Sequence, residues 1–351
     1  MDGTKLSLRQ KKILSIITKE ALSRPQINLF LEKIYPISKL TLIRELNYLM
    51  ALKIVKKIGS GNNIRYALKE ENPLLNFIDI QQYFDDQASR NKLNPIAFNF
   101  KMFDYLKNLI TPQDLNEFEI ILLSLREQEK KLDPTIFRRE IERFIIEFSW
   151  KSSKIEGNTY SLLETEVLIK QSKEAPGHSK YEAVMILNHK RAIEYILLHR
   201  NIFKKITLSQ IINLHAILTK GLEVTSGIRN NPVAISGSNY LPLSSKKEIE
   251  NSLNKFIKAV NSNRNPLEKA LISLTLISYI QPFADGNKRT ARVLANAVLI
   301  SHDCYPVTFR NVEDTDYLKA LLLFYEKTNL FNFKHMFLEQ YRFALQNYFR
   351  T

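Results

Sequence analysis

The sequence is poor in cysteine, in glycine and in long apolar runs. Cys304 is the only cysteine among 351 residues, which excludes a disulfide framework and any metal site built from several cysteines. The longest apolar run, ALISLTLISYI over residues 270–280, is too short to cross a bilayer. The first residues, MDGTKLSLRQKK, lack the apolar core of a secretion signal. We therefore expect a soluble, cytoplasmic protein in a reducing compartment, with no membrane partner.

Helical periodicity and positive charge are what the sequence has in abundance. Only 9 glycines occur, 44% of the residues are hydrophobic, and long stretches repeat with a helical period, so we expect a mainly α-helical protein of two or more domains. The net charge is +15, and residues 1–70 hold 14 Lys or Arg against 5 Asp or Glu. This first fifth of the chain thus holds more than half of the excess charge, which favours an acidic partner, above all nucleic acid.

Residues 1–70 predict three helices followed by a β-hairpin. Helices are expected around residues 8–17 and 24–33, and a third begins after Ser38, which can cap it. The apolar stripe of that third helix is expected to consist of Leu40, Ile43, Leu46, Leu49 and Met50. KIVKKIGSGNNIRYALK then places two β-rich runs around a glycine-rich turn. This order resembles the winged helix-turn-helix family.

The resemblance implies DNA as a partner. We expect side chains that lie off the apolar stripe of the third helix to contact it. We expect the third helix to face a major groove and the wing to lie near phosphates, through Lys39, Thr41, Arg44, Lys56, Lys57 and Arg65. A winged fold can instead serve protein contacts, such as those of a homodimer.

The rest of the chain predicts a connector and then a helical domain. Residues 71–110, with Pro73 and Pro95, are expected to form connector helices, and residues 111–345 a larger domain. Thr111-Pro112 and Asp133-Pro134 each combine a cap residue with proline at the first helical position, so each opens a helix. Further helices are expected at about 159–172, 179–198, 207–219, 246–260, 266–280, 287–302 and 314–326. GIRNNPVAISGSNYLP, residues 227–242, has β-branched residues and glycine turns and predicts a small β-hairpin.

QPFADGNKRTAR, residues 281–292, combines the features of a phosphate site. The turn at Gly286 lets backbone N–H groups approach an anion, and the helix that follows offers its free N–H groups and the positive end of its dipole. Arg289 and Arg292 lie one turn apart on one face, and Asp285 offers a hard oxygen ligand. A carboxylate together with phosphates is the usual way to hold Mg²⁺. The loop therefore predicts a site for a magnesium-bound polyphosphate.

The stretch PF-x-DGN-K-R-x-x-R resembles the signature of the Fic family (filamentation induced by cAMP), H-x-F-x-D/E-G-N-G/K-R-x-x-R, over roughly residues 110–340. The resemblance implies an all-helical Fic fold with a small β-hairpin flap, and transfer of AMP from ATP to a hydroxyl of an unknown target protein. It implies that Asp285 holds Mg²⁺, that Gly286, Asn287 and Lys288 line the anion hole, and that Arg289 and Arg292 bind the β- and γ-phosphates. The catalytic positions would be Gln281, Asn287 and Arg289.

Two further segments acquire a role from the same resemblance. The hairpin at 227–242 matches the flap that pairs with an extended target segment, and Gly227, Arg229, Val233 and Ile235 belong to it. SSKIEG, residues 152–157, resembles the family's inhibitory motif, S/T-x-x-x-E-G/N, at the end of an expected helix over 133–157. The resemblance implies that Glu156, four residues from Ser152, pairs with Arg292 and keeps it from the γ-phosphate.

Gln281 stands where the family has its catalytic histidine. An amide cannot take up a proton near neutral pH, and general base catalysis contributes about 10²- to 10⁴-fold in rate. We therefore expect an autoinhibited protein adenylyltransferase with impaired activity. Two alternatives stay open: a DNA-binding regulator whose Fic core binds nucleotide without catalysis, and a kinase like the Doc branch, which shares the lysine at Lys288 but generally lacks the last arginine.

Overall fold

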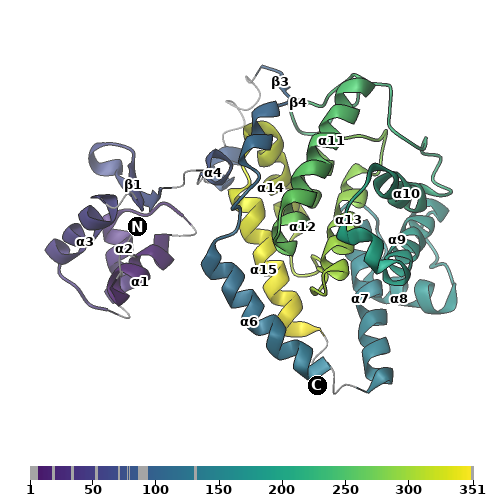
Figure 1. Ribbon diagram of the computed structural model, residues 1–351, viewed down its shortest axis with the longest axis horizontal. Coiled ribbons are helices and arrows are strands. Elements are labelled where there is room, and N and C mark those ends of the chain that lie inside the picture. The colour runs from purple at the N-terminus through teal and green to yellow at the C-terminus, as the bar shows by residue number, and fades with distance from the viewer. Residues whose placement is uncertain are drawn as a thin grey trace. The chain divides into compact units, whose positions relative to one another are not determined.

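The structure is a computed structural model that describes residues 7–17, 20–32, 35–51, 54–69, 72–76, 78, 80–85, 94–129 and 133–348 (Figure 1). The chain divides into two compact units, Met1–Gln87 and Ala88–Thr351. In the part of the chain that is described, no helix combines the length and the apolar composition that crossing a bilayer requires.

The first unit has the expected order of elements. Three helices, α1 (Leu8–Ile17), α2 (Arg24–Glu32) and α3 (Lys39–Ala51), precede the antiparallel strands β1 (Val55–Ile58) and β2 (Arg65–Leu68), followed by the short helices η2 (Pro73–Leu75) and α4 (Ile80–Asp85). Buried side chains from all three helices and both strands form one core; among them are Ile13, Ile27, Leu46, Val55 and Tyr66. The short α1 and α2 depend on this shared core, because isolated helices of about ten residues are marginal in water.

The predicted apolar stripe of α3 is partly wrong. Leu46 and Leu49 are fully buried as expected, but Leu40 is 69% exposed and Leu42 is buried in its place. The spacing 42, 46 and 49 follows one helical face, whereas Leu40 lies about 200° around the helix from Leu42. Ser38 caps this helix as predicted, because its hydroxyl accepts from the Thr41 N–H at 3.1 Å.

The second unit is built around two buried helices. α12 (Pro266–Ile280) and α13 (Asn287–Ser301) pack against each other, and every residue of α12 from Leu267 to Ile280 is buried. Around this pair lie α6 (Pro112–Glu129), α7 (Pro134–Lys154), α8 (Leu162–Gln171), α9 (Lys180–Leu198), η4 (Arg200–Lys204), α10 (Leu208–Thr219), α11 (Lys246–Ser262), α14 (Asp314–Lys327) and α15 (Phe331–Asn347) (Figure 1). The central pair holds the predicted phosphate loop, residues 281–286, at one end.

Local signals define most of these helices. Asp133 accepts from the Thr135 N–H at 2.7 Å and Asn265 from the Leu267 N–H at 2.9 Å, and in both cases proline opens the helix. α15 was not predicted. Its residues Phe333, Phe337, Tyr341 and Leu345 are buried at a spacing of four, which is the helical period of the sequence in this segment.

The hairpin predicted at 227–242 is wrong. Within this fully described segment only β4 (Tyr240–Leu241) is a strand, and it pairs in parallel with β3 (Ile96–Ala97), inside the segment expected to be a helical connector. The described part of the predicted connector, residues 71–110, does contain three short helices: η2, α4 and η3 (Phe100–Tyr105). Pro232 cannot donate to a ladder, and the side chain of Arg229 binds backbone carbonyls of the segment that a paired strand would need.

Candidate functional site

The loop between α12 and α13 turns sharply at both of its ends. Gln281 ends α12 in the left-handed region (φ 50°), and its N–H donates to the Ile277 carbonyl at 3.1 Å. Gly286 begins α13 with φ 78°, and a Cβ there would lie 3.2 Å from the methyl carbon of Thr219. Glycine is therefore required at this turn by both conformation and space.

Phe283 and Asn287 hold the loop between these turns. The ring of Phe283 is fully buried and stacks on His215, with ring centroids 3.7 Å apart. The Asn287 side chain accepts from the Phe283 N–H at 2.9 Å and donates to the Phe283 carbonyl at 2.8 Å. No side chain caps α13, so the N–H groups of its first turn remain for an outside acceptor.

Two buried guanidinium groups face this helix start. Arg289 is 2% exposed and donates to Asp285 Oδ2 at 2.7 Å, and Arg292 has no exposed surface. One terminal nitrogen of each, Nη1, is buried and has no hydrogen-bond partner among the described residues. Buried donors without an acceptor are costly, so these groups indicate a ligand that carries several anionic oxygens.

Glu156 forms ion pairs with two of the cations of this site. Its Oε1 accepts from Arg292 Nη2 at 2.7 Å, and its Oε2 lies 3.1 Å from Lys288 Nζ. Burial by itself would raise the pKa of Glu156, but Arg292 and Lys288 outweigh it and lower that pKa to about 2. The contact with Arg292 was expected from the sequence, whereas the contact with Lys288 was not.

Ser152 binds the same guanidinium from the end of α7. Its hydroxyl accepts from Arg292 Nε at 2.8 Å and its carbonyl from Arg292 Nη2 at 2.9 Å. The turn after α7 then brings Glu156 to the site, since the Glu156 N–H donates to the Ser153 carbonyl at 2.9 Å and Gly157 follows with φ 90°.

His189 lies behind Ser152 and was not singled out by sequence reasoning. Its Nε2 is 2.8 Å from Ser152 Oγ, and its Nδ1 is 2.9 Å from the Met185 carbonyl. Burial and then the charge of Arg292 lower the pKa of His189 to about 3, so the ring is neutral. A carbonyl only accepts, so Nδ1 carries the proton and Nε2 accepts from Ser152. The Ser152 hydroxyl is thereby directed to accept from Arg292.

Both the oxygen and the nitrogen of the Gln281 side-chain amide form hydrogen bonds within the protein. Its Oε1 accepts from Asn287 Nδ2 at 2.8 Å, and its Nε2 donates to the Ser278 carbonyl at 2.6 Å. His215 packs against the loop. Its Nε2 donates to the Asp285 carbonyl at 3.0 Å, and burial lowers its pKa, so the neutral ring supports the loop.

Asp285 offers one carboxylate to a metal ion. The described residues contain no group of three His, Cys, Asp or Glu side chains that could hold a metal. Mg²⁺, however, is commonly bound by one or two carboxylates together with substrate phosphates and water. The side chain of Asp285 is 60% exposed beside Arg289, so it fits a magnesium ion shared with a bound phosphate.

The residues assigned to the flap lie in an irregular segment with bends and turns. Arg229 is 5% exposed, and its side chain donates to the carbonyls of Gln281 at 2.7 Å, Asn231 at 2.6 Å and Leu243 at 2.5 Å. Its N–H also donates to the Pro282 carbonyl at 3.0 Å. Arg229 therefore connects its own segment to the phosphate loop through hydrogen bonds to the carbonyls of Gln281 and Pro282. Gly227 has φ 83°, and Val233 and Ile235 are half-buried.

The residues predicted to contact DNA lie on the first unit, and most are exposed. Lys39, Arg44, Lys57 and Arg65 are exposed. The other two are engaged within the unit: the Thr41 hydroxyl lies 2.9 Å from that of Ser38, and Lys56 Nζ donates to Asn76 Oδ1 at 2.9 Å.

Part of the chain, which includes the phosphate loop, matches a known protein family. Residues 205–299 match the model of the Fic/DOC family. The chain is 29% identical over 191 residues to the protein adenylyltransferase Fic of Nematostella vectensis, covering 52% of this chain and 44% of that protein. It is 32% identical over 106 residues to a probable protein adenylyltransferase of Aquifex aeolicus, covering 30% of this chain and 32% of that protein. The chain thus spans less than half the length of these curated relatives.

Solved structures show the same fold. Fic-1 of Caenorhabditis elegans (residues 134–508) superposes with a TM-score of 0.55 at 20% identity, covering 68% of this chain and 73% of that one. A Fic domain containing signaling protein of Bacteroides thetaiotaomicron superposes with a TM-score of 0.54 at 21% identity, covering 66% of this chain and 95% of that one.

Proposed function

Because the chain contains a Fic/DOC family domain, we propose that it is a protein adenylyltransferase that binds ATP and Mg²⁺ at residues 281–292, restrained by Glu156 and impaired by Gln281. The observation that carries the proposal is the pair of buried guanidinium groups, Arg289 and Arg292, each with an unpartnered Nη1, beside the uncapped start of α13. These groups suit the β- and γ-phosphates.

The proposed reaction moves AMP to a protein hydroxyl. The hydroxyl oxygen attacks the α-phosphorus, the bond between that phosphorus and the oxygen bridging to the β-phosphate breaks, and pyrophosphate leaves. Asp285 would hold Mg²⁺, which would supply positive charge to the phosphate oxygens. Arg289, Arg292 and the first N–H groups of α13 hold the leaving pyrophosphate. The hydroxyl proton needs an acceptor, and the amide of Gln281 is not a base.

Glu156 restrains the site by competing with the nucleotide. Its carboxylate occupies Nη2 of Arg292 and the amine of Lys288. The carboxylate leaves only Nη1 of Arg292 to a γ-phosphate and places a negative charge beside it, so it prevents a two-pronged contact with the guanidinium and repels the phosphate. The restraint lies between α7 and α13, within a single unit of the chain.

A second candidate is a nucleotide-sensing DNA-binding regulator. Two observations favour it: the amide of Gln281 is bound inside the protein at both ends, and Lys39, Arg44, Lys57 and Arg65 are exposed on the strongly basic first unit. In this case ATP would bind without being consumed, and its binding would change the affinity for DNA.

Labelled ATP distinguishes the candidates. The chain, Gln281→His, Glu156→Gly and the double variant are incubated with α-labelled ATP, Mg²⁺ and a protein extract. We expect label on protein chiefly in the two Gln281→His proteins, and most in the double variant. Absence of label from the double variant, although calorimetry shows that it binds ATP, would reject the transferase proposal. Label from γ-labelled ATP instead would indicate phosphoryl transfer, and ATP-dependent gel shifts with genomic fragments would favour the regulator.

A further inference from the structure

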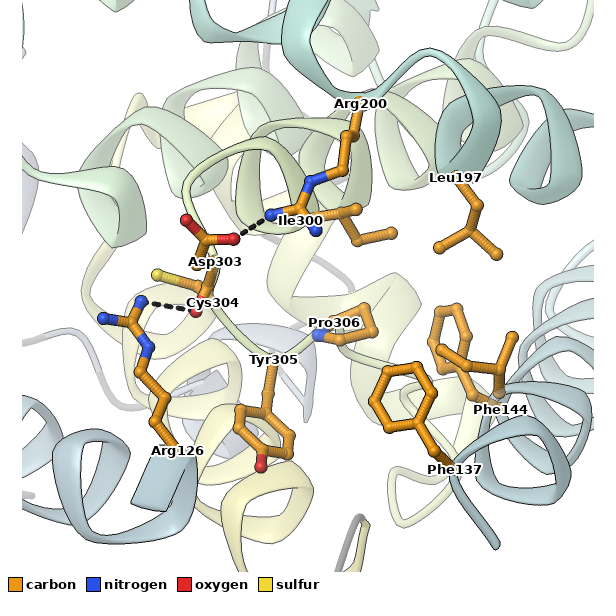
Figure 2. Close-up of a pocket in the computed structure, with 11 residues that line it drawn as sticks. Arg126, Phe137, Phe144, Leu197, Arg200, Ile300, Asp303, Cys304, Tyr305 and Pro306 are labelled. Carbon is orange, nitrogen blue, oxygen red and sulfur yellow. Dashed lines mark hydrogen bonds and ion pairs between the residues drawn. The ribbon is translucent and has the colours of Figure 1, made fainter. Parts of the chain in front are cut away.

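A second cavity lies at the opposite end of α13 from the phosphate loop. It has a volume of about 520 Å³, is open to solvent, and is lined by α6, α7, the end of α9, η4, the end of α13 and the loop that follows (Figure 2). Ile300 on its wall is separated from Asn287 by about 20 Å along the helix. The cavity is therefore distinct from the site proposed for ATP.

One side of this cavity is apolar. Phe137, Ile141 and Phe144 line it from one face of α7, at a spacing of four and three residues. Leu197 of α9 and Pro306 complete the wall, and Figure 2 shows Leu197 and the two phenylalanine rings on the same side of the cavity. These α7 residues lie 8 to 15 positions before Ser152, which contacts Arg292, so they belong to a different part of the helix.

The other side carries two guanidinium groups and one carboxylate. Arg126 donates to the Asp303 carbonyl at 2.6 Å, and its Nε is buried with no hydrogen-bond partner in the described part of the chain. Arg200 pairs with the carboxylate of Asp303. Figure 2 shows Arg126, Asp303 and Arg200 lying away from the phenylalanine rings. Two positive charges against one negative charge leave this side with an excess of positive charge.

We propose that this cavity binds a small molecule with an aromatic or aliphatic body and one anionic head group. Ligand cavities usually measure about 300–1,000 Å³ and combine apolar walls with a few polar groups, as this one does. The body would lie against Phe137, Phe144 and Leu197. The head group would lie beside Arg126 and Arg200, because guanidinium groups bind carboxylates and sulfonates with directed, charge-assisted hydrogen bonds. This proposal does not depend on adenylyl transfer.

The first test fills the cavity and uses 8-anilinonaphthalene-1-sulfonate, a fluorescent aromatic anion, as the probe. Leu197→Trp places an indole in the cavity, and Leu198→Trp is the matched control because Leu198 is 81% exposed and does not line it. We expect saturable binding to the full chain and to Leu198→Trp, and at least about tenfold weaker binding to Leu197→Trp, a loss of about 1.4 kcal/mol. Ile141→Trp, which fills the cavity from α7, should give the same loss, and circular dichroism checks that each variant is folded. Equal affinities in the chain and in both filling variants would overturn the proposal.

The second test concerns the charge of the head group. N-phenyl-1-naphthylamine has the same ring system without the sulfonate. We expect Arg200→Gln to weaken binding of the anionic probe about threefold or more and to leave the neutral probe unchanged. Lys205→Gln, an exposed charge outside the cavity, should change neither. If Arg200→Gln has the same effect on both probes, the proposed preference for an anion is wrong.

Discussion

The carboxylate of Glu156 lies 2.7 Å from Nη2 of Arg292, a guanidinium that has no exposed surface. The two residues are separated by 136 positions in the sequence and come from the turn after α7 and from α13. Because Arg292 is a proposed ligand of the γ-phosphate, this ion pair leaves only Nη1 of the guanidinium to ATP and places a negative charge beside it.

Removing the carboxylate should strengthen nucleotide binding. Glu156→Gly is expected to increase the affinity for ATP with Mg²⁺ by about tenfold or more, since buried charge-assisted hydrogen bonds contribute on the order of 2 kcal/mol. Isothermal titration calorimetry measures the change, and Glu166→Gly, at a half-exposed position of α8, serves as the control. If the affinity and the position of the bound α-phosphate are both unchanged, Glu156 does not restrain the site.

His189 should act on nucleotide binding through Ser152. Replacing it by glutamine disturbs the acceptor that orients the Ser152 hydroxyl, so ATP affinity should rise a few-fold, less than in Glu156→Gly. A double-mutant cycle with Ser152→Ala tests whether His189 acts through the Ser152 hydroxyl. The effect of His189→Gln on ATP affinity should vanish when that hydroxyl is absent. Ser153→Ala is the control, because that hydroxyl lies 3.3 Å from the ring and does not bind Arg292. Fully additive effects would contradict this role.

Acid should remove the stability that Glu156 provides. Its pKa falls from 4.5 to about 2 in the folded protein, so the folded state binds fewer protons than the unfolded state between these values. The contribution is present above pH 4.5 and is lost as the pH falls to about 2; its full size is about 3 kcal/mol. Urea unfolding of the chain and of Glu156→Gln over this range measures it. Parallel curves for the two proteins at all pH values would contradict the assignment.

Arg229 should stabilise the phosphate loop rather than meet a target protein. Arg229→Met leaves the carbonyls of Gln281, Asn231 and Leu243 without this donor, which should cost on the order of 3 kcal/mol in unfolding free energy and weaken ATP binding. Chemical denaturation and calorimetry check both effects, with Arg191→Met, an exposed arginine of α9, as the control. A variant of unchanged stability and ATP affinity would show that Arg229 has no such role.

Local signals in the sequence were sufficient for most helices and for the phosphate loop. Proline after a cap residue, glycine at Gly286 and a regular apolar period act within a few residues, so helices such as α7, α12 and α13 could be placed without tertiary information. The same holds for Glu156 and Arg292, which could be paired because a motif resemblance connects them.

Contacts between distant segments could not be predicted in this way. The segment at 227–242 has the residues of a hairpin, yet Arg229 ties it to Gln281 and β4 pairs with β3. His189 and the cavity beside Phe137 depend on how α7, α9 and α13 pack. The sequence by itself determined most of the helices and the residues proposed to hold phosphate, because caps and periodicity are local. Only the tertiary structure decided which donors are already occupied, because a buried hydrogen bond depends on the acceptor that packing brings to it.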